Sequence, residues 1–252
     1  MHFFRVLRFF RFIFREKTLP LQLQNLKIMR KKISLDNNTM AVAKSTIYEK
    51  FHTATWWYSF KYEVAGLLGR LFYNRTPPKK SYLLHLGCGS TYLDDFVNTD
   101  YYYLRWLPFV KQTEKYDWLQ DFRRKLNCPD EYWEGVFTEH TLEHLHYVDC
   151  LKLFKELHRT MKKGAWLRIC VPGLDEVLSQ NLQNIPRAEQ IYHLTQNYGH
   201  VSVWDSELMF RVLQDAGFET MHKVAYLQGT DKRLIHDSEI RSAESLYIEV
   251  QK

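Results

Sequence analysis

Two short segments of the 252-residue chain carry residue types that could do chemistry. The first is a Gly-x-Gly turn, residues 87–89, which ends an apolar run that starts at Ser81. Glycines allow the backbone amides of such a turn to come close to a ligand. The second is EHTLEHLH, starting at Glu139, whose acidic and imidazole side chains can hold or move protons. A ligand-binding turn and a group of acid–base residues are therefore the candidate site.

Two single acids follow other short apolar stretches. Asp100 comes thirteen residues after Gly87, and Asp121 lies near the end of the strand-like run 116–122. A dinucleotide-binding fold has its acid about 20 residues after the glycine turn, so this spacing is too short for that fold.

The elements that must position these residues alternate along the chain. Apolar periodicity predicts a helix over 147–161, which Lys162-Lys163-Gly164 would end with cations in the last turn and a glycine after it. We expect buried strands in the runs that begin at residues 81, 96, 116, 135 and 165.

In this order, LHLGCGS, NTD, DF, FTEHTLEHL and MKKGAWLRICVPGLDE resemble a class I S-adenosylmethionine-dependent methyltransferase. The nearest likeness is to the small type-11-like enzymes of bacterial surface-polysaccharide gene clusters. GHVSVWDSELMFRVLQDAGFE and RSAESLYIEVQK agree with the family's C-terminal part, so the resemblance covers residues 81–252. It implies a seven-stranded, mostly parallel, Rossmann-like α/β sheet with an antiparallel last strand and helices on both faces.

The resemblance also implies how S-adenosylmethionine is bound. The backbone of residues 87–89 would run alongside the methionine part of the cofactor, and Asp100 would accept hydrogen bonds from both ribose hydroxyls. Asp121 would face the adenine amino group, with Phe122 beside the ring. His85 stands where the family commonly has an acid, and Thr91 where it has a third glycine. The expected cofactor-binding residues are His85, Gly87, Cys88, Gly89, Asp100, Asp121, Phe122 and Glu139.

Methyl transfer from a sulfonium is an in-line displacement that depends mainly on holding donor and acceptor in line. An alcohol acceptor also benefits from a base. His140 and Glu139, next to the sulfonium, are the expected catalytic residues, with His144 and Asp175 as alternatives. His140 could instead be a positional contact, and Glu143 and His144 could only cap a helix. From the sequence alone we expect no metal ion at the site.

Three other functions have some support. HTLEH, residues 140–144, matches the H-x-x-E-H signature of zinc hydrolases, although it follows a strand and a glycine turn. A non-catalytic Rossmann-like binding or scaffold protein at the membrane would keep the fold without the chemistry. A nucleic-acid methyltransferase needs basic residues near its site, whereas residues 36–252 have a net charge of −2. We therefore expect no nucleic-acid partner.

The overall charge of +6 comes from the N-terminus. Residues 1–35 carry nine Lys or Arg and one acid, a net charge of +8. In a helix over residues 1–17 the arginines would face one side and most aromatic rings the other, as in helices that lie on anionic membranes. Docking on the rest of the protein and a targeting role are the alternatives. We expect a cytoplasmic protein that is peripheral on the inner face of the membrane.

The remaining segments complete the domain organisation. Residues 36–80 are expected to be a helical region, with an amphipathic pattern from about 46 to 73 and a boundary at RTPPKK, residues 75–80. The methyltransferase domain would be 81–252. The four cysteines include no CxxC pair, which indicates a reducing compartment.

The acceptor surface is expected mainly between residues 173 and 203, with the polar loop 228–242 over it. Polar and aromatic side chains there suit a sugar ring or another small molecule. The candidates are Asp175, Glu176, His193, Tyr198, His200, Trp204, the Tyr101–Tyr103 run and Trp106. The resemblance favours a glycan or glycolipid precursor.

Overall fold

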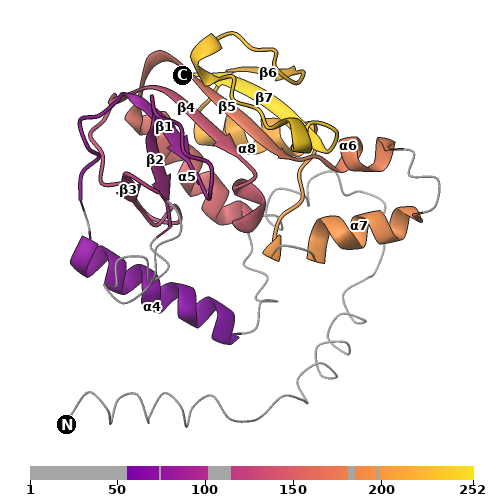
Figure 1. Cartoon of the computed structure of the whole chain (residues 1–252), viewed down its shortest axis with the longest axis horizontal. Helices are drawn as coiled ribbons and strands as arrows, with labels where there is room; N and C mark the ends of the chain where they lie inside the picture. Colours follow the sequence, from indigo (N-terminus) through magenta and orange to yellow (C-terminus); the bar gives the residue numbers. More distant parts are fainter. Residues whose placement is uncertain (1–55, 74, 102–114, 181–184, 197–198) are drawn as a thin grey trace, which may run out of the picture. The chain divides into compact units, whose positions relative to one another are not determined.

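The computed structural model describes residues 56–73, 75–101, 115–180, 185–196 and 199–252 (Figure 1). All of them belong to one compact unit, residues 45–252. The predictions for the basic tail, for the first part of the helical region and for Tyr102, Tyr103, Trp106 and Tyr198 lie outside the described residues. The predicted domain limits stay predictions.

A single seven-stranded sheet organises the unit, with strand order β3-β2-β1-β4-β5-β7-β6 (Figure 1). Strand β7 is antiparallel to both neighbours, and the other pairs are parallel. This confirms the predicted sheet. The strands are β1 Leu83–Leu86, β2 Val97–Asp100, β3 Trp118–Leu119, β4 Trp133–Glu139, β5 Met161–Pro172, β6 Thr220–Val224 and β7 Ser245–Gln251.

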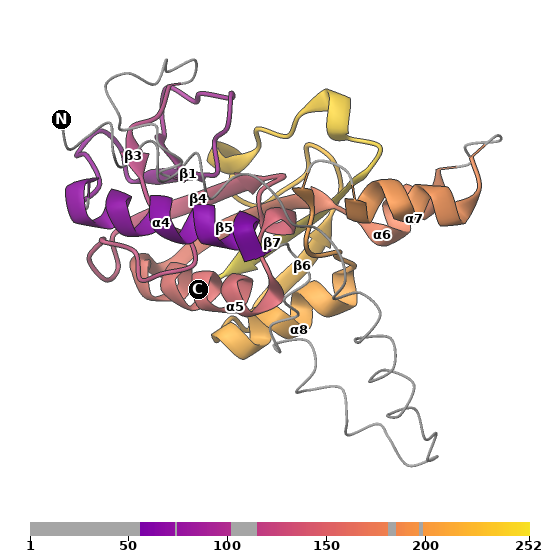
Figure 2. The same cartoon turned by 90° about the horizontal axis from the view of Figure 1, so that it is seen from below.

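One face of the sheet is covered by helices α5 (Tyr147–Thr160) and α8 (Ser206–Ala216), which pack against each other (Figures 1 and 2). Leu84, Leu86 and Val136 point to this side because side chains alternate along a strand. Apolar side chains of both helices complete the main core there. The same alternation turns His85 and Phe137 to the opposite face.

The opposite face is covered by the segment 225–241, which includes the short helices η3 (Lys232–Leu234) and η4 (Glu239–Arg241). We expected helices on both faces, but between β1 and β2 the described residues form turns instead of a helix. Arg168 of β5 ties the covering segment to the sheet. Its fully buried guanidinium donates to Asp237 and, at 3.0 Å, to Glu249 of β7.

Helix α5 ends earlier than predicted. It stops at Thr160, and residues 161–164 already belong to β5, where Met161 pairs with Trp133. The fully buried Thr160 donates its hydroxyl hydrogen bond to the carbonyl of Glu156, which closes the last turn. Gly164 has a φ of +78°, but it lies inside the strand instead of capping the helix.

Helix α4 (Trp56–Tyr73) is joined to the region after β3 by ion pairs. Arg70 Nη1 lies 2.7 Å from Asp121, and Arg123 Nη1 lies 2.9 Å from Glu63. The helices near the carboxyl end of β5 are α6 (Leu174–Ser179) and α7 (Arg187–Gln196). The one-turn helix η1 (Leu142–His144) follows β4.

Candidate functional site

The glycine turn after β1 is built for close backbone approach. Gly87 and Gly89 have φ values of +71° and +50°, which strain any residue with a Cβ. A Cβ on Gly87 would meet the Thr141 side chain at 2.1 Å, whereas a Cβ on Gly89 would meet no described residue within 4 Å. The amides of Gly87 and Cys88 donate to the carbonyl of Thr99, both at 2.9 Å. The turn is therefore fixed against β2 on one side and open beside Gly89.

Asp100 lies at the carboxyl end of β2, beside the open part of this turn. Its carboxylate accepts hydrogen bonds from Gly89 N at 3.1 Å and Tyr101 N at 2.6 Å. Carboxylate oxygens have about four acceptor positions together, and the side chain is half-buried, so it can also meet a ligand diol. The turn and Asp100 lie side by side, and their backbone amides and carboxylate fit the polar groups of S-adenosylmethionine.

The two residues expected at the adenine lie in a more crowded place. Asp121 is buried, and its carboxylate accepts from Arg123 Nε at 2.9 Å and Arg70 Nη1 at 2.7 Å. Phe122 belongs to the main core. An adenine amino group would therefore have to share Asp121 with two guanidinium groups.

His85 does not reach the glycine turn. Its ring is buried 5.2 Å from the ring of Phe137, and its Nδ1 lies 3.1 Å from Asn98 Oδ1. Burial lowers the pKa of His85 to about 4, so the imidazole is neutral near pH 7. Cys88 is also buried, and it takes part in the turn through its backbone amide.

The segment 139–144, directly after β4, connects the turn to a second group of residues. Thr141 Oγ1 donates to the carbonyl of Gly87 at 3.2 Å. His140 adopts a left-handed backbone with φ of +49°, and its Nε2 lies 2.9 Å from Ser245 Oγ. Glu139 accepts a hydrogen bond from Ser238 N at 2.8 Å. Burial lowers the pKa of His140 to about 3 and raises that of Glu139.

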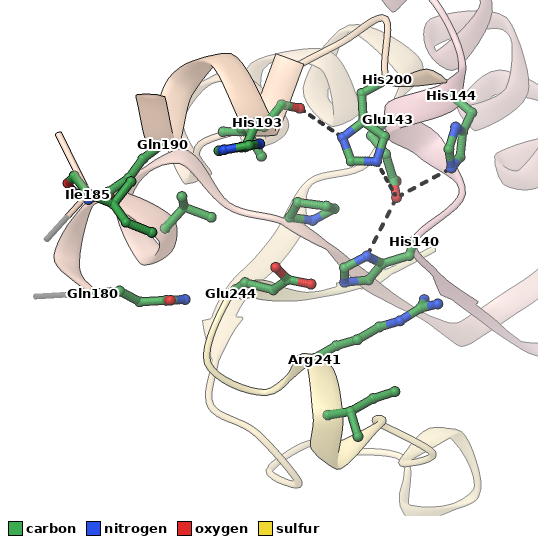
Figure 3. Close-up of a pocket in the computed structure, with 14 residues that line it drawn as sticks. His140, Glu143, His144, Gln180, Ile185, Gln190, His193, His200, Arg241 and Glu244 are labelled. Atoms are coloured by element: carbon green, nitrogen blue, oxygen red, sulfur yellow. Dashed lines mark hydrogen bonds and ion pairs between the residues drawn. The ribbon is translucent and has the colours of Figure 1, made fainter. Parts of the chain in front are cut away.

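Glu143 stands at the centre of this second group (Figure 3). Three imidazole nitrogens surround its Oε1, from His140 at 3.6 Å, His144 at 3.8 Å and His200 at 3.9 Å. The side chain is 2% exposed, and within the described part of the chain neither carboxylate oxygen has a hydrogen-bond partner. Burial raises the pKa of Glu143 to about 8. Its backbone carbonyl accepts from Val201 N at 2.8 Å, which holds the His200 segment beside it.

A cavity of about 820 Å³ opens next to this group (Figure 3). Of the expected acceptor residues, His193 and His200 line it. Trp204 is instead buried against Tyr147, and Glu176 pairs with Lys223 at 2.7 Å. The lining residues are His140, Glu143, His144, Pro172, Val177, Gln180, Ile185, Gln190, His193, Leu194, His200, Ile240, Arg241 and Glu244.

Ile240 and Arg241 come from the loop predicted to cover the site. Gln180, Gln190 and Glu244 also line the cavity, and no sequence motif identified them. They come from three separate polar segments, so only the tertiary fold brings them together.

A family model described as a methyltransferase domain matches residues 56–223, which is more than half of the chain. The chain belongs to this methyltransferase family. S-adenosylmethionine is its cofactor, and the open glycine turn with Asp100 fits that molecule. The family match does not favour the scaffold or zinc-hydrolase alternative.

Solved methyltransferase structures are similar to this chain at low identity. An S-adenosylmethionine-dependent methyltransferase from Archaeoglobus fulgidus is 14% identical, with a TM-score of 0.45, over 79% of this chain and 100% of that chain. A possible histamine N-methyltransferase from Thermotoga maritima is 14% identical, with a TM-score of 0.46, over 77% of this chain and 92% of that chain. No curated protein matches the chain. Among the helices that the structure describes, none has the length and apolar character needed to cross a membrane.

Proposed function

We propose that this methyltransferase moves the methyl group of S-adenosylmethionine to a hydroxyl oxygen of a polar small molecule. A sugar of a glycan or glycolipid precursor is the acceptor class that we favour. The observation that carries the proposal is the segment 139–144. Its Thr141 contacts the glycine turn, and its His140 lines the cavity. Donor site and cavity therefore share one short, fixed piece of backbone.

This arrangement suits a displacement reaction. Bound S-adenosylmethionine supplies a methyl group on a sulfonium, which is already a reactive electrophile. What the protein adds is mainly position, because aligned reactants react as if at very high concentration. Thr141 fixes the turn that would hold the donor, and Ser245 lies within hydrogen-bond distance of the His140 ring, which faces the cavity.

The polar residues of the cavity wall support the proposal of a polyhydroxylated acceptor. Gln180 and Gln190 each offer a donor and an acceptor, Arg241 offers donors only, and Glu244 offers acceptors only. A sugar alternates donors and acceptors in the same way. The body of the protein also lacks the positive charge that a nucleic-acid acceptor requires.

We assign to His140 the task of orienting the acceptor hydroxyl. Its low pKa keeps the ring neutral, so one nitrogen can accept a hydrogen bond from that hydroxyl. The same low pKa makes His140 a weak base. Its main task is therefore to orient the acceptor hydroxyl, and it removes the hydroxyl proton only weakly. Glu139 is held by Ser238 and contributes negative charge beside the sulfonium site.

The test uses full-length protein, S-adenosylmethionine with a labelled methyl group, and three separate acceptor panels. The first panel contains nucleotide sugars and sugar phosphates, the second contains primary amines, and the third contains oligonucleotides. We expect label only in the sugar panel, as an O-methyl ether identified by mass spectrometry. His140→Ala should lower kcat at least about tenfold while the cofactor Kd stays unchanged. His222→Ala, at an exposed histidine of β6, is the matched control. Label only in amines or oligonucleotides, or in no panel, contradicts the proposal.

We also propose that residues 1–17 hold the enzyme on the anionic inner face of a membrane. The support is the arrangement of arginines opposite aromatic residues in the sequence. Deleting these residues should abolish co-sedimentation with vesicles of anionic phospholipid and leave the cofactor Kd unchanged. Vesicle binding that survives the deletion contradicts this proposal.

A further inference from the structure

We infer that Glu143, His144 and His200 form a binding site for a divalent transition-metal ion at the wall of the cavity. Each residue offers one ligand atom, and these atoms lie within 4.8 Å of one another. The distances from Glu143 Oε1 are 3.8 Å to His144 Nε2 and 3.9 Å to His200 Nε2. Neighbouring ligands of a tetrahedral zinc ion lie about 3.4 Å apart, given metal–ligand bonds of about 2.1 Å. Each of the two distances from Glu143 would therefore have to shorten by about half an ångström.

The state of Glu143 is an independent observation that points to a cation. Both carboxylate oxygens are buried and have no hydrogen-bond partner among the residues that the structure describes. Leaving an ionised group there without compensation costs several kcal/mol, so buried carboxyl groups are normally protonated, paired with a cation or bound to a metal. In Figure 3 the carboxylate points toward the imidazoles, which line the cavity wall.

Both imidazoles have the second partner that is typical of metal-binding histidines. His200 Nδ1 lies 2.8 Å from the carbonyl oxygen of Leu194, and His144 forms a hydrogen bond with the backbone of Gly199. A carbonyl only accepts, so Nδ1 of His200 carries the hydrogen and its Nε2 turns a lone pair toward Glu143. Metal ligands are commonly held in one tautomer by such a bond to a backbone carbonyl.

The ligand set indicates the class of ion. Two imidazoles and one carboxylate are typical of catalytic zinc and of non-haem iron(II) sites, whereas magnesium and calcium prefer oxygen ligands alone. Three protein ligands leave a position for water or for an acceptor hydroxyl. That role rests on the proposed function: the ion would lower the pKa of the bound hydroxyl, so that its proton is released to water. Metal binding itself does not depend on it.

The location explains why such an ion would matter for methyl transfer. Thr141, which contacts Gly87 of the cofactor turn, precedes Glu143 by only two residues. His140 lies on the other side of Glu143, with its Nδ1 3.6 Å from the same carboxylate oxygen. An ion held by Glu143 would therefore lie beside His140, the residue that we assign to orienting the acceptor.

The experiment measures metal binding without donor or acceptor present. Full-length protein is treated with a chelator, dialysed and titrated with Zn²⁺ by calorimetry, and with Co²⁺ by visible absorption. We expect one ion per chain and a Co²⁺ spectrum with ligand-field bands. His144→Ala and His200→Ala should each weaken Zn²⁺ binding at least about 100-fold. His193→Ala is the matched control, because His193 lines the same cavity outside the three-residue group.

Circular dichroism and melting temperature check that each variant is folded, and His144→Gln replaces any alanine variant that is not. The inference is overturned if wild-type protein binds no ion more tightly than about 10 µM, or if His144→Ala binds as tightly as wild type. Either result leaves the methyl-transfer test intact, since that test detects labelled product in the sugar panel. Absence of product with stoichiometric, His144-dependent zinc would contradict the proposed function alone.

Discussion

Replacing Arg168 by methionine should remove a large part of the protein's stability. The guanidinium is completely buried and binds Asp237 through Nε at 2.7 Å and Glu249 through Nη1 at 3.0 Å. Without it, the two buried carboxylates keep the backbone amides of Leu227 and Thr230 and the Cys170 thiol as donors, and none of these carries a positive charge. Breaking a buried ion pair by removing one partner costs about 3–5 kcal/mol. The free energy of unfolding of a whole domain is only about 5–15 kcal/mol.

Urea unfolding at pH 7 measures this change, with melting temperature as a second measure. At about 2–4 °C per kcal/mol, the melting temperature should fall by roughly 6–20 °C. Arg211→Met is the matched control, since Arg211 forms an exposed pair with Glu207 and should cost below about 0.5 kcal/mol. The triple variant R168M/D237N/E249Q should recover most of the loss, because no buried charge is left unpaired. An Arg168→Met loss within about 1 kcal/mol of the Arg211→Met loss would refute this reasoning.

Three further predictions concern the sheet and the cofactor turn. Because the folded pKa of His85 is about 4 and the ordinary value is 6.5, its contribution to stability is present above pH 6.5 and is lost as the pH falls toward 4. The free energy of unfolding lost in this way is roughly 3 kcal/mol. Melting curves at pH 7.5 and 4.5 should therefore show a smaller fall in melting temperature for His85→Leu than for wild type, and an equal fall would contradict this prediction. Gly87→Ala should destabilise the fold more than Gly89→Ala, by at least about 1 kcal/mol, because both residues have positive φ but only Gly87 faces Thr141. Equal melting temperatures of the two variants would contradict this, since they would mean that the Thr141 side chain moves away from the added methyl group. Asp100→Asn should weaken S-adenosylmethionine binding roughly 10- to 100-fold in calorimetry, since hydrogen bonds to a charged group contribute about 1.5–3 kcal/mol, and an unchanged Kd would remove Asp100 from the cofactor site.

The sheet could be predicted from the sequence because its strands are local signals. Four short apolar runs lie in β1, β2, β3 and β4, and the segment AWLRICV lies in β5. Boundaries were less predictable. Lys162-Lys163-Gly164 has the composition of a helix end, yet these residues extend β5 because Met161 pairs with Trp133. Pairing with a distant strand overrides a local capping pattern.

Contacts between distant segments explain what the sequence could not predict in the site. Asp121 has the position of an adenine-facing acid, but its ion pair with Arg70 joins residues 51 positions apart. His85 has the position of a cofactor contact, but the alternation of β1 turns it into the opposite face of the sheet. Arg168 is one charged residue in an apolar run, and only the return of Asp237 over the sheet explains why it is tolerated.

The motif HTLEH shows how one backbone angle changes the chemistry that a pattern predicts. In a continuous helix, His140 and His144 would share one face as a pair of ligands. In the structure His140 has a φ of +49° and lies before η1, which is a single turn from Leu142 to His144. His144 therefore groups with His200, with ring centroids 5.1 Å apart, and His140 is not part of that group of possible ligands. Because the break falls at His140, the next residue can contact the glycine turn while Glu143 faces the cavity. The left-handed residue thus allows one stretch of six residues to contact both the glycine turn and the cavity.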